Sequence, residues 1–577
     1  MNENLPSLQS IKIYNQGIEK LLKGNKEDAA EDFRQALSDS PGWIEPLLSL
    51  AELALQPNGP IQAKERNQLK RDLQIQKLQN SPDPRALYLL SRHYQQSKDL
   101  QKAIDLLKKI IREVPDFDLA SQQLAALLLQ QERWSEAEKL LCHQIKRHPN
   151  QAHLLVNLSV ALLRQNRLQE ALATAQEAMV QGSEDEQPSI HVNLGTILQE
   201  LGRREEARIE YEATLQLKPK HINALLNLGV IALQDKHLSR AEDLFRKVLK
   251  LQPDDIRTHV NLAGTLLLQE KYEEGWEYYE KRLQGLNQIL KAPKDLRLWK
   301  GEQLSGTLIL VHEQGLGDTF QFIRYAALLK KQGIRCYFYG PDKMHSILKN
   351  SNLLEGCLSE HEKLPEDAEA WIALMSLAPL LGATPKKPLI GSIPYLSISE
   401  KHLDHWERIL GPRHRLRVAL HWQGNPDHEF TISRGRSLAL DTLQPLIDCQ
   451  NIEWVSLQKG PGSEQSKKGK FAKRWHRKQS HINDAWCFED TGAILKCCDG
   501  LISSDSGLAH LAGALGIRTW LLLPWLAEWR WGLNGETSPW YPNHILFRQE
   551  AESDWSRPIK SLKQLLTTYK APNSYNG

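Results

Sequence analysis

Small and apolar positions recur at a fixed spacing through the first half of the chain. A small residue is followed by alanine after twelve positions, by an aromatic or aliphatic residue after sixteen and by proline after twenty-four. This frame predicts units of two packed helices, with the small residues where the helices touch and the proline ending the second helix. Copies of the frame are Gly17–Pro41, Ser91–Pro115, Ala125–Pro149, Gly195–Pro219 and Gly229–Pro253.

The frame resembles the tetratricopeptide repeat, whose period is 34 residues. Asn193-Leu194-Gly195 and Asn227-Leu228-Gly229 match the first-helix motif of that family. The resemblance implies about eight repeats between residues 10 and 286. We therefore expect an all-α superhelix over residues 1–286, with a concave groove that binds an extended peptide of a protein partner.

One polar position recurs inside the array. Side-chain amides both donate and accept hydrogen bonds, so a row of them suits a peptide backbone. We interpret these residues as the groove's peptide-binding side chains; the alternative is that they are merely solvated first-helix residues. They are Asn157, Asn193, Asn227 and Asn261.

After residue 305 the pattern changes to short apolar runs that alternate with helical segments, which predicts parallel β-sheets covered by helices. Pro, Gly and Lys interrupt this rhythm over residues 383–398, so we expect two Rossmann-like halves at 306–398 and 399–577, joined to the repeats by a linker at 287–305. The fold class is thus a repeat superhelix followed by an α/β region. The expected strands are Thr307–His312, Arg335–Tyr339, Ala370–Leu374, Arg417–Trp422, Ile452–Gln458, Leu501–Ser503 and Thr519–Pro524.

Composition narrows the function classes. The 73 basic and 70 acidic side chains give a net charge of +3, which offers no argument for nucleic acid or for a membrane surface. The first residues lack the pattern of a signal peptide, and no apolar run is long enough to span a bilayer. The seven cysteines include no CxxC pair, which argues against a disulfide framework or a zinc site. We expect a cytoplasmic protein.

The stretch Leu501–Gly516 reads as a strand, a tight polar turn and a helix of small residues. The first N–H groups of a helix lack intrahelical partners and carry partial positive charge, so such a turn holds phosphate in α/β proteins. The alternative is an ordinary connection with Asp505 or Ser506 as the N-cap. The residues predicted to line this turn are Asp505, Ser506, Gly507 and His510.

A second glycine turn follows Thr307–His312 and leads into an expected helix, Thr319–Gln332. Asp318 is either a site carboxylate at the mouth of that helix or its N-cap. Strand ends from two α/β halves face a common cleft. The remaining residues predicted to line the cleft are Gly315 and Gly317 from the first half and Gln423, Gly424, Asn425, Arg436 and Gln458 from the second.

Several of these motifs together resemble the glycosyltransferase domain of bacterial tetratricopeptide-repeat proteins, which is similar to the family 9 heptosyltransferases of the GT-B fold. The resemblance covers roughly residues 295–550. Its motifs are HEQGLGDTFQFIRY, RSL at Arg436–Leu438, SLQKG, DSGLAHLAGALG, WRW and SPWYP…FRQ.

The resemblance implies sugar transfer from a nucleotide-sugar donor, with inversion and without a metal or other cofactor. Asp318 takes the position of the proposed general base, and the Ser506 and Gly507 amides would stabilise the leaving diphosphate. Where heptosyltransferases use a lysine, this loop offers Arg434 and Arg436, of which we favour Arg436.

Other interpretations stay open. The domain could be a catalytically silent scaffold that binds partners through its repeats, or an enzyme of envelope glycans. The basic segment Lys467–Lys478 contains seven Lys or Arg, and we interpret it as a solvated loop rather than a nucleic-acid patch. Trp529–Trp531 either stacks on a ligand or belongs to the core.

Overall fold

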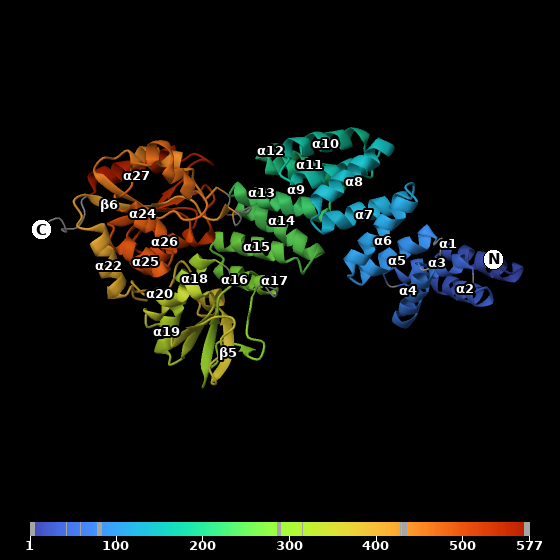
Figure 1. The fold of residues 1–577 in the computed structure, drawn as a ribbon, viewed down its shortest axis with the longest axis horizontal. Coiled ribbons are helices and arrows are strands. Elements are labelled where there is room, and N and C mark those ends of the chain that lie inside the picture. The colour runs from blue at the N-terminus through green and yellow to red at the C-terminus, as the bar shows by residue number, and fades with distance from the viewer. Residues whose placement is uncertain are drawn as a thin grey trace. The chain divides into compact units, whose positions relative to one another are not determined.

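The computed structural model describes residues 6–569 except 42, 58, 78–82, 286–289, 314, 390, 427, 428 and 430–434. Arg434 and the start of the expected linker lie outside the described residues. The chain forms two compact units, residues 1–224 and 225–577, each considered by itself below. Figure 1 shows the first unit as helices alone and both sheets within the second.

The first unit is a succession of paired helices. Rings from the second helix of a pair pack on glycines of the first: a Cβ on Gly17 would lie 2.7 Å from Phe33 Cε1, and one on Gly195 would lie 2.7 Å from Tyr211 Cε1. The helices are α1 (Leu8–Leu22), α2 (Lys26–Asp39), α3 (Ile44–Ala54), α4 (Ala63–Lys77), α5 (Pro84–Gln96), α6 (Leu100–Glu113), α7 (Asp118–Gln130), α8 (Trp134–Arg147), α9 (Ala152–Arg164), α10 (Leu168–Gln181), α11 (Gln187–Glu200) and α12 (Arg204–Leu217), and α13 (Ile222–Gln234) crosses into the second unit.

The turns inside the pairs share one backbone conformation. Lys98, Glu132 and Asn166 lie 34 residues apart and have φ of 62°, 57° and 61°. Lys236 and Glu270 repeat this in the second unit, at φ of 61° and 63°. A left-handed residue here reverses the chain between two antiparallel helices. The 34-residue period of the sequence therefore coincides with a period in the backbone conformation of these turns.

The second unit begins with helices of the same type: α14 (Leu238–Leu251), α15 (Ile256–Leu268), α16 (Tyr272–Glu280) and the short α17 (Arg282–Gly285). They pack directly on the α/β region. Trp276 Nε1 donates to the Ala383 carbonyl at 3.1 Å, and Trp525 Nε1 donates to the Gln234 carbonyl at 3.1 Å. Lys236 Nζ lies 3.4 Å from the centre of the Trp525 ring, a cation–π contact.

The first sheet has the order β1-β5-β2-β3-β4, and all its described pairings are parallel. Every residue of β2 is buried, as expected for a central parallel strand. Its elements are β1 (Arg297–Leu298), β2 (Thr307–Val311), α18 (Leu316–Phe322), α19 (Ala326–Lys331), β3 (Cys336–Tyr339), α20 (His345–Lys349), β4 (Gly356–Leu358), β5 (Ala368–Ala373) and α21 (Leu377–Leu380).

The second sheet has the order β10-β9-β8-β6-β7 and is also parallel. Its elements are α22 (Glu400–Leu410), β6 (Leu416–His421), α23 (Gln444–Ile447), β7 (Ile452–Ser456), α24 (Gln479–Asp484), α25 (Phe488–Lys496), β8 (Gly500–Ser504), α26 (Gly507–Ala514), β9 (Thr519–Leu523), β10 (His544–Arg548) and α27 (Ser556–Thr568). Two parallel five-stranded sheets with flanking helices confirm the expected α/β character of this region.

One predicted element is wrong. The helix expected over Thr319–Gln332 is interrupted by a 3₁₀ turn at Ile323–Tyr325, which separates α18 from α19. All three residues of this turn are buried, whereas a continuous α-helix lying on a sheet presents only one face to it. Arg324 bonds here to the carbonyls of Gln321 and Trp540.

None of the described helices is both long enough and apolar enough to cross a membrane. All seven cysteines are free thiols.

Candidate functional site

The two glycine turns meet each other. A Cβ on Gly317, at the start of α18, would lie 3.1 Å from the Gly507 Cα and 2.8 Å from the Cδ2 atom of His510. A Cβ on Gly507, the first residue of α26, would lie 3.3 Å from the Gly317 N. The two helices pack together, one from each half (Figure 1). Both positions therefore need glycine for this approach.

Asp318 lies beside this junction and is ion-paired with an arginine from the far end of the chain. Its Oδ1 accepts from the Arg530 guanidinium at 2.5 Å. Gly315, at φ 79°, makes room for it, because a Cβ there would lie 2.3 Å from Asp318 Oδ2. Burial raises the pKa of Asp318, and Arg530 opposes that rise. Arg530 thus favours the ionised carboxylate, the form that a general base requires.

Arg530 stands among three carboxylates. Its second terminal nitrogen lies 3.0 Å from Glu528 Oε2, and its charge also lowers the pKa of Asp505, which burial raises. The Arg530 side chain is only 10% exposed, and its Nε is buried without a hydrogen-bond acceptor among the described residues. Asp318 and Glu528 therefore share one guanidinium.

Glu528 provides a prediction on pH. Burial, with smaller contributions from Asp505 and Asp318, raises its pKa to about 7, against about 4.3 in an unfolded chain. The folded state therefore holds this proton more tightly. The resulting stabilisation is complete below about pH 4 and is lost as pH rises through about 7. Wild type should lose thermal stability relative to Glu528→Gln between about pH 5 and 7.5. A difference between the two midpoints that stays constant over this range would contradict the assignment.

Arg436 lies beside Gly424 of the turn after β6, where a Cβ would lie 3.5 Å from the Arg436 Nε. Gly424 N donates to Ser437 Oγ at 3.0 Å, and Ser437 Oγ bonds to Glu429. Arg436 Nε lies 3.8 Å from Glu429 Oε1, and no hydrogen-bond acceptor of the described residues reaches it. The positive charge of Arg436 lowers the pKa of Asp505, against the larger rise that burial causes. Among the described residues, the Nε atoms of Arg436 and Arg530 are therefore both buried without a hydrogen-bond acceptor.

Gln458 holds the turn after β6 in shape. Its Oε1 accepts from the backbone N–H groups of Trp422 and Gln423, both at 3.0 Å, and its Nε2 donates to the carbonyls of Gln423 and Pro461. Its side chain is therefore occupied by backbone groups in this structure. The Gln423 side chain contacts Gly462, because a Cβ at Gly462 would lie 2.4 Å from Gln423 Oε1. Asn425 is exposed at the end of the turn.

The side chains at the start of α26 are engaged within the protein. Ser506 Oγ lies 3.2 Å from His421 Nδ1 and 3.1 Å from Ser503 Oγ. His510 Nδ1 bonds to the Tyr541 hydroxyl at 3.0 Å, and burial holds the pKa of His510 well below its usual value. His510 is thus a neutral, positioned residue. What this turn offers a ligand is the backbone N–H groups of the first helical turn.

The four asparagines predicted to line the repeat groove differ in how deeply they are buried. Asn193 is 7% exposed and donates to Ser159 Oγ at 2.6 Å, which ties two successive repeats of the first unit together. Asn157, Asn227 and Asn261 are half-buried. Asn193 therefore has a structural partner, and peptide binding by this position stays a prediction.

The sequence did not predict that Arg530 pairs with Asp318, or that Glu528 lies beside the same guanidinium. Trp529 and Trp531, which flank Arg530, are buried and pack on Trp276 and His510, with ring centres 5.1 and 5.3 Å apart, so this segment is core rather than a stacking surface. The sequence signal for this pairing was the presence of two charged residues, Glu528 and Arg530, within the aromatic segment that follows the buried strand β9. Such charges need partners, and the sequence does not say which.

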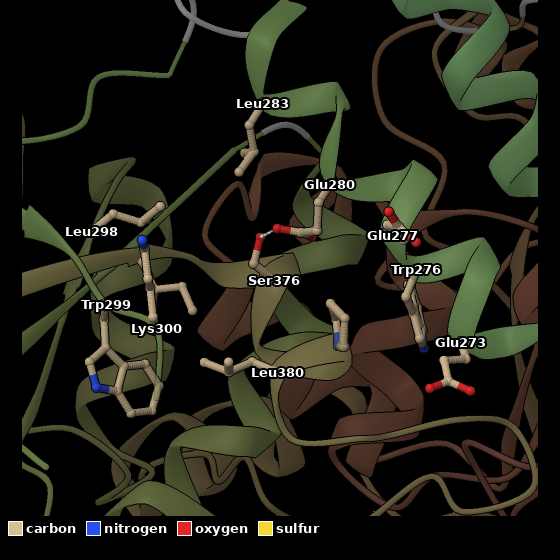
Figure 2. A pocket seen from close by; sticks show the side chains of 12 residues that line it. Glu273, Trp276, Glu277, Glu280, Leu283, Leu298, Trp299, Lys300, Ser376 and Leu380 are labelled. Carbon is tan, nitrogen blue, oxygen red and sulfur yellow. Dashed lines mark hydrogen bonds between the residues drawn. The ribbon is translucent and has the colours of Figure 1, made fainter. Parts of the chain in front are cut away.

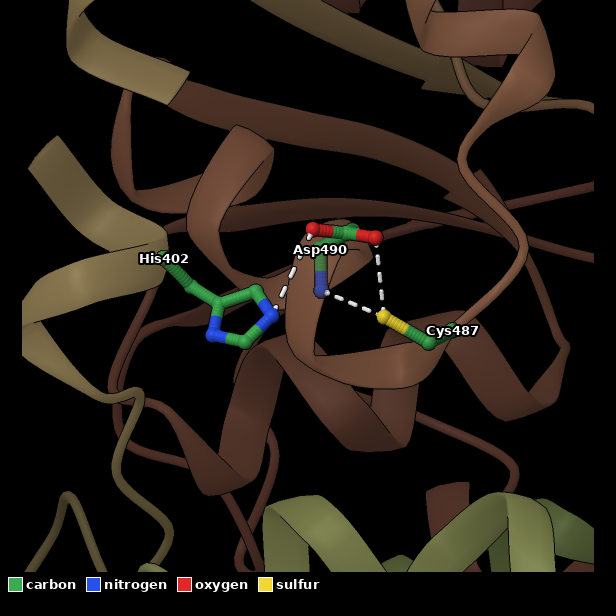
Figure 3. A group of neighbouring side chains, drawn as sticks. All are labelled: His402, Cys487 and Asp490. Carbon is green, nitrogen blue, oxygen red and sulfur yellow. Dashed lines mark hydrogen bonds and ion pairs between the residues drawn. The ribbon is translucent and has the colours of Figure 1, made fainter. Parts of the chain in front are cut away.

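One group of described residues has metal-ligand side chains within 4.8 Å of one another: His402, Cys487 and Asp490 (Figure 3). Cys487 Sγ donates to Asp490 Oδ2 at 2.9 Å and accepts from Asp490 N at 3.2 Å, as an N-cap of α25. His402 Nε2 lies 3.8 Å from Asp490 Oδ1, and its Nδ1 lies 3.1 Å from Glu489 Oε1. Partners within the protein thus account for all three side chains.

Comparisons with known proteins bear on this architecture. Two family models of the tetratricopeptide repeat match residues 94–155 and 186–254, so the chain contains these repeats, as predicted.

Protein FlbA of Caulobacter vibrioides is 22% identical over 528 residues, which cover 84% of each protein. Protein O-mannosyl-transferase TMTC3 of Homo sapiens is 28% identical over 203 residues, 33% of this chain and 22% of TMTC3, so this chain spans about a fifth of that protein. A tetratricopeptide repeat protein of Parabacteroides merdae has a crystal structure that matches with a TM-score of 0.38 and 13% identity, over 45% of this chain and 100% of that one.

Proposed function

We propose that the protein is a glycosyltransferase of the GT-B fold, similar to the family 9 heptosyltransferases, that uses a nucleotide-sugar donor while its repeats recruit a protein or peptide acceptor. The observation that carries the proposal is the junction of the two glycine turns, where Asp318 of one half lies beside the N-terminus of α26 in the other. A carboxylate beside an anion-binding helix start suits a transfer in which a proton is removed and a diphosphate leaves.

The comparisons add support of two kinds. The match to FlbA is too long to lie within the repeats alone, which end near residue 285, so the pairing of repeats with this α/β region recurs in another protein. TMTC3 is named as a protein O-mannosyl-transferase, and the matched part of it is small.

The proposed reaction is a direct displacement with inversion that uses no metal. Asp318 accepts the proton of the acceptor hydroxyl while that oxygen bonds to the anomeric carbon. The bond from this carbon to the diphosphate oxygen breaks, and the diphosphate takes the electron pair. The N–H groups at the start of α26 and the Arg436 guanidinium would stabilise the growing charge.

The test is a binding panel. Purified protein is heated with UDP, GDP, ADP, CMP and sugar conjugates of each. We expect one nucleotide to stabilise the protein, by about 2.7 kcal/mol at a hundred times its Kd. Asp505→Ala and Arg436→Ala should lose that stabilisation, and Asp404→Ala, an exposed aspartate of α22, should keep it. No response to any nucleotide would contradict the proposal and favour the silent scaffold.

A further inference from the structure

A cavity lies between the last repeat helices and the edge of the first sheet, and no residue of the glycine turns lines it. It has a volume of about 410 Å³ and is entirely within the second unit. Figure 2 shows side chains of α16 and α17 on one side and residues of and after β1 on the other, with Leu380 between them.

The cavity combines a buried apolar floor with an exposed apolar rim. Trp276 and Trp299 are 6% and 4% exposed, whereas Leu298 and Leu380 are 41% and 38% exposed. Only four large hydrophobic side chains are exposed in the described part of the second unit, and two of them are these leucines. Exposed apolar side chains gathered at one hollow mark an interaction site more often than scattered ones do.

The charge around the cavity is mostly negative. Glu273 and Glu277 lie one turn apart on α16, and both are exposed. Glu280 is partly neutralised, since it pairs with Arg282 at 2.6 Å and accepts from Ser376 Oγ at 2.7 Å. Lys300 is the one cationic side chain of the lining, and it lies on the opposite side from α16 (Figure 2). A ligand with positive charge beside an apolar group complements this surface.

The cavity opens beside a free sheet edge. β1 pairs with β5 on one side, and no strand of the described residues pairs with its other side. An open edge lets an extended peptide add backbone hydrogen bonds, while a neighbouring pocket selects one of its side chains.

We propose that this cavity docks a short extended segment of a partner protein, with an apolar side chain between Leu298 and Leu380 and a Lys or Arg on Glu273 and Glu277. The proposal goes beyond sugar transfer and does not depend on it, because docking here needs no nucleotide and uses no residue of the glycine turns. It also differs from the repeat groove, since none of the asparagines of the array lines this cavity.

The experiment selects peptides from a phage library of random dodecapeptides on the full chain. The enriched peptide is then synthesised with a fluorescent label, and its Kd is measured by anisotropy. We expect enrichment of an apolar residue next to Lys or Arg. The Kd should rise at least tenfold with Glu273→Lys/Glu277→Lys and also with Leu380→Gln. The matched control Asp404→Lys/Glu407→Lys makes the same charge change at exposed positions of α22 and should leave the Kd unchanged.

Thermal midpoints of all variants establish that each remains folded. The proposal is overturned if no such motif is enriched, or if the selected peptide binds the Glu273→Lys/Glu277→Lys variant as tightly as wild type. It is also overturned if sedimentation shows that this variant loses self-association, since the occupant would then be a second copy of the chain.

Discussion

Arg282→Met should destabilise the second unit by about 3–5 kcal/mol, because it leaves a buried carboxylate without its charged partner. Arg282 Nε and a terminal nitrogen bond to the two oxygens of Glu313 at 2.9 and 3.0 Å, and the two side chains are 9% and 2% exposed. After the change, Glu313 keeps the Met375 N–H, at 2.9 Å. Urea unfolding followed by tryptophan fluorescence measures the effect, since only Trp43 and Trp134 of the sixteen tryptophans precede residue 225.

Two variants make this result specific. Lys363→Met removes one member of an ion pair that is 85% and 91% exposed, and we expect no measurable change there. Arg282→Met/Glu313→Gln removes both charges and should recover part of the loss. If Arg282→Met were as stable as Lys363→Met, the last repeat helix would not be held to the first sheet by this pair.

Arg530→Met should destabilise the second unit by about 3 kcal/mol at pH 7.5. It removes the cation bonded to Asp318 and Glu528, and we expect the low end of the range for a buried pair because these carboxylates are 25% and 24% exposed. The loss should shrink as pH falls toward 5, because burial raises the pKa of Glu528 to about 7 and its carboxyl is then neutral. Urea unfolding at both pH values measures the change.

A triple variant separates charge from packing. Arg530→Met/Asp318→Asn/Glu528→Gln leaves no net charge among these three side chains and should be more stable than Arg530→Met alone at pH 7.5. Equal stability of the two variants, or a loss from Arg530→Met that is independent of pH, would show that the guanidinium acts by packing alone.

The elements that the sequence predicts are those whose signal is local. The repeat period reflects contacts made within 34 residues, such as the rings of Phe33 and Tyr211 on Gly17 and Gly195. The strands β2 and β9 are buried along their whole length, and each appears in the sequence as four consecutive apolar residues after a threonine. The break of the helix after Asp318 was not predictable, because it depends on Arg324 reaching Trp540, 216 residues later.

The candidate site was predictable only as a set of turns. Parallel topology brings the carboxyl ends of β2, β6 and β8 to defined edges, and glycines allow two turns to touch. Which charges pair was not predictable: Arg530 and Asp318 are 212 residues apart. The same limit applies to Asn193, whose recurrence is visible in the sequence but whose bond to Ser159 depends on the packing of neighbouring repeats.

The most direct test of the central claim is the rate at which Asp318→Asn consumes the donor that the binding panel identifies, with water as the acceptor. We predict that this variant binds the donor with wild-type affinity and that its turnover falls by about 10²–10⁴-fold, because the acceptor proton has no base. Turnover by Asp318→Asn at the wild-type rate, with donor binding intact, would contradict the account.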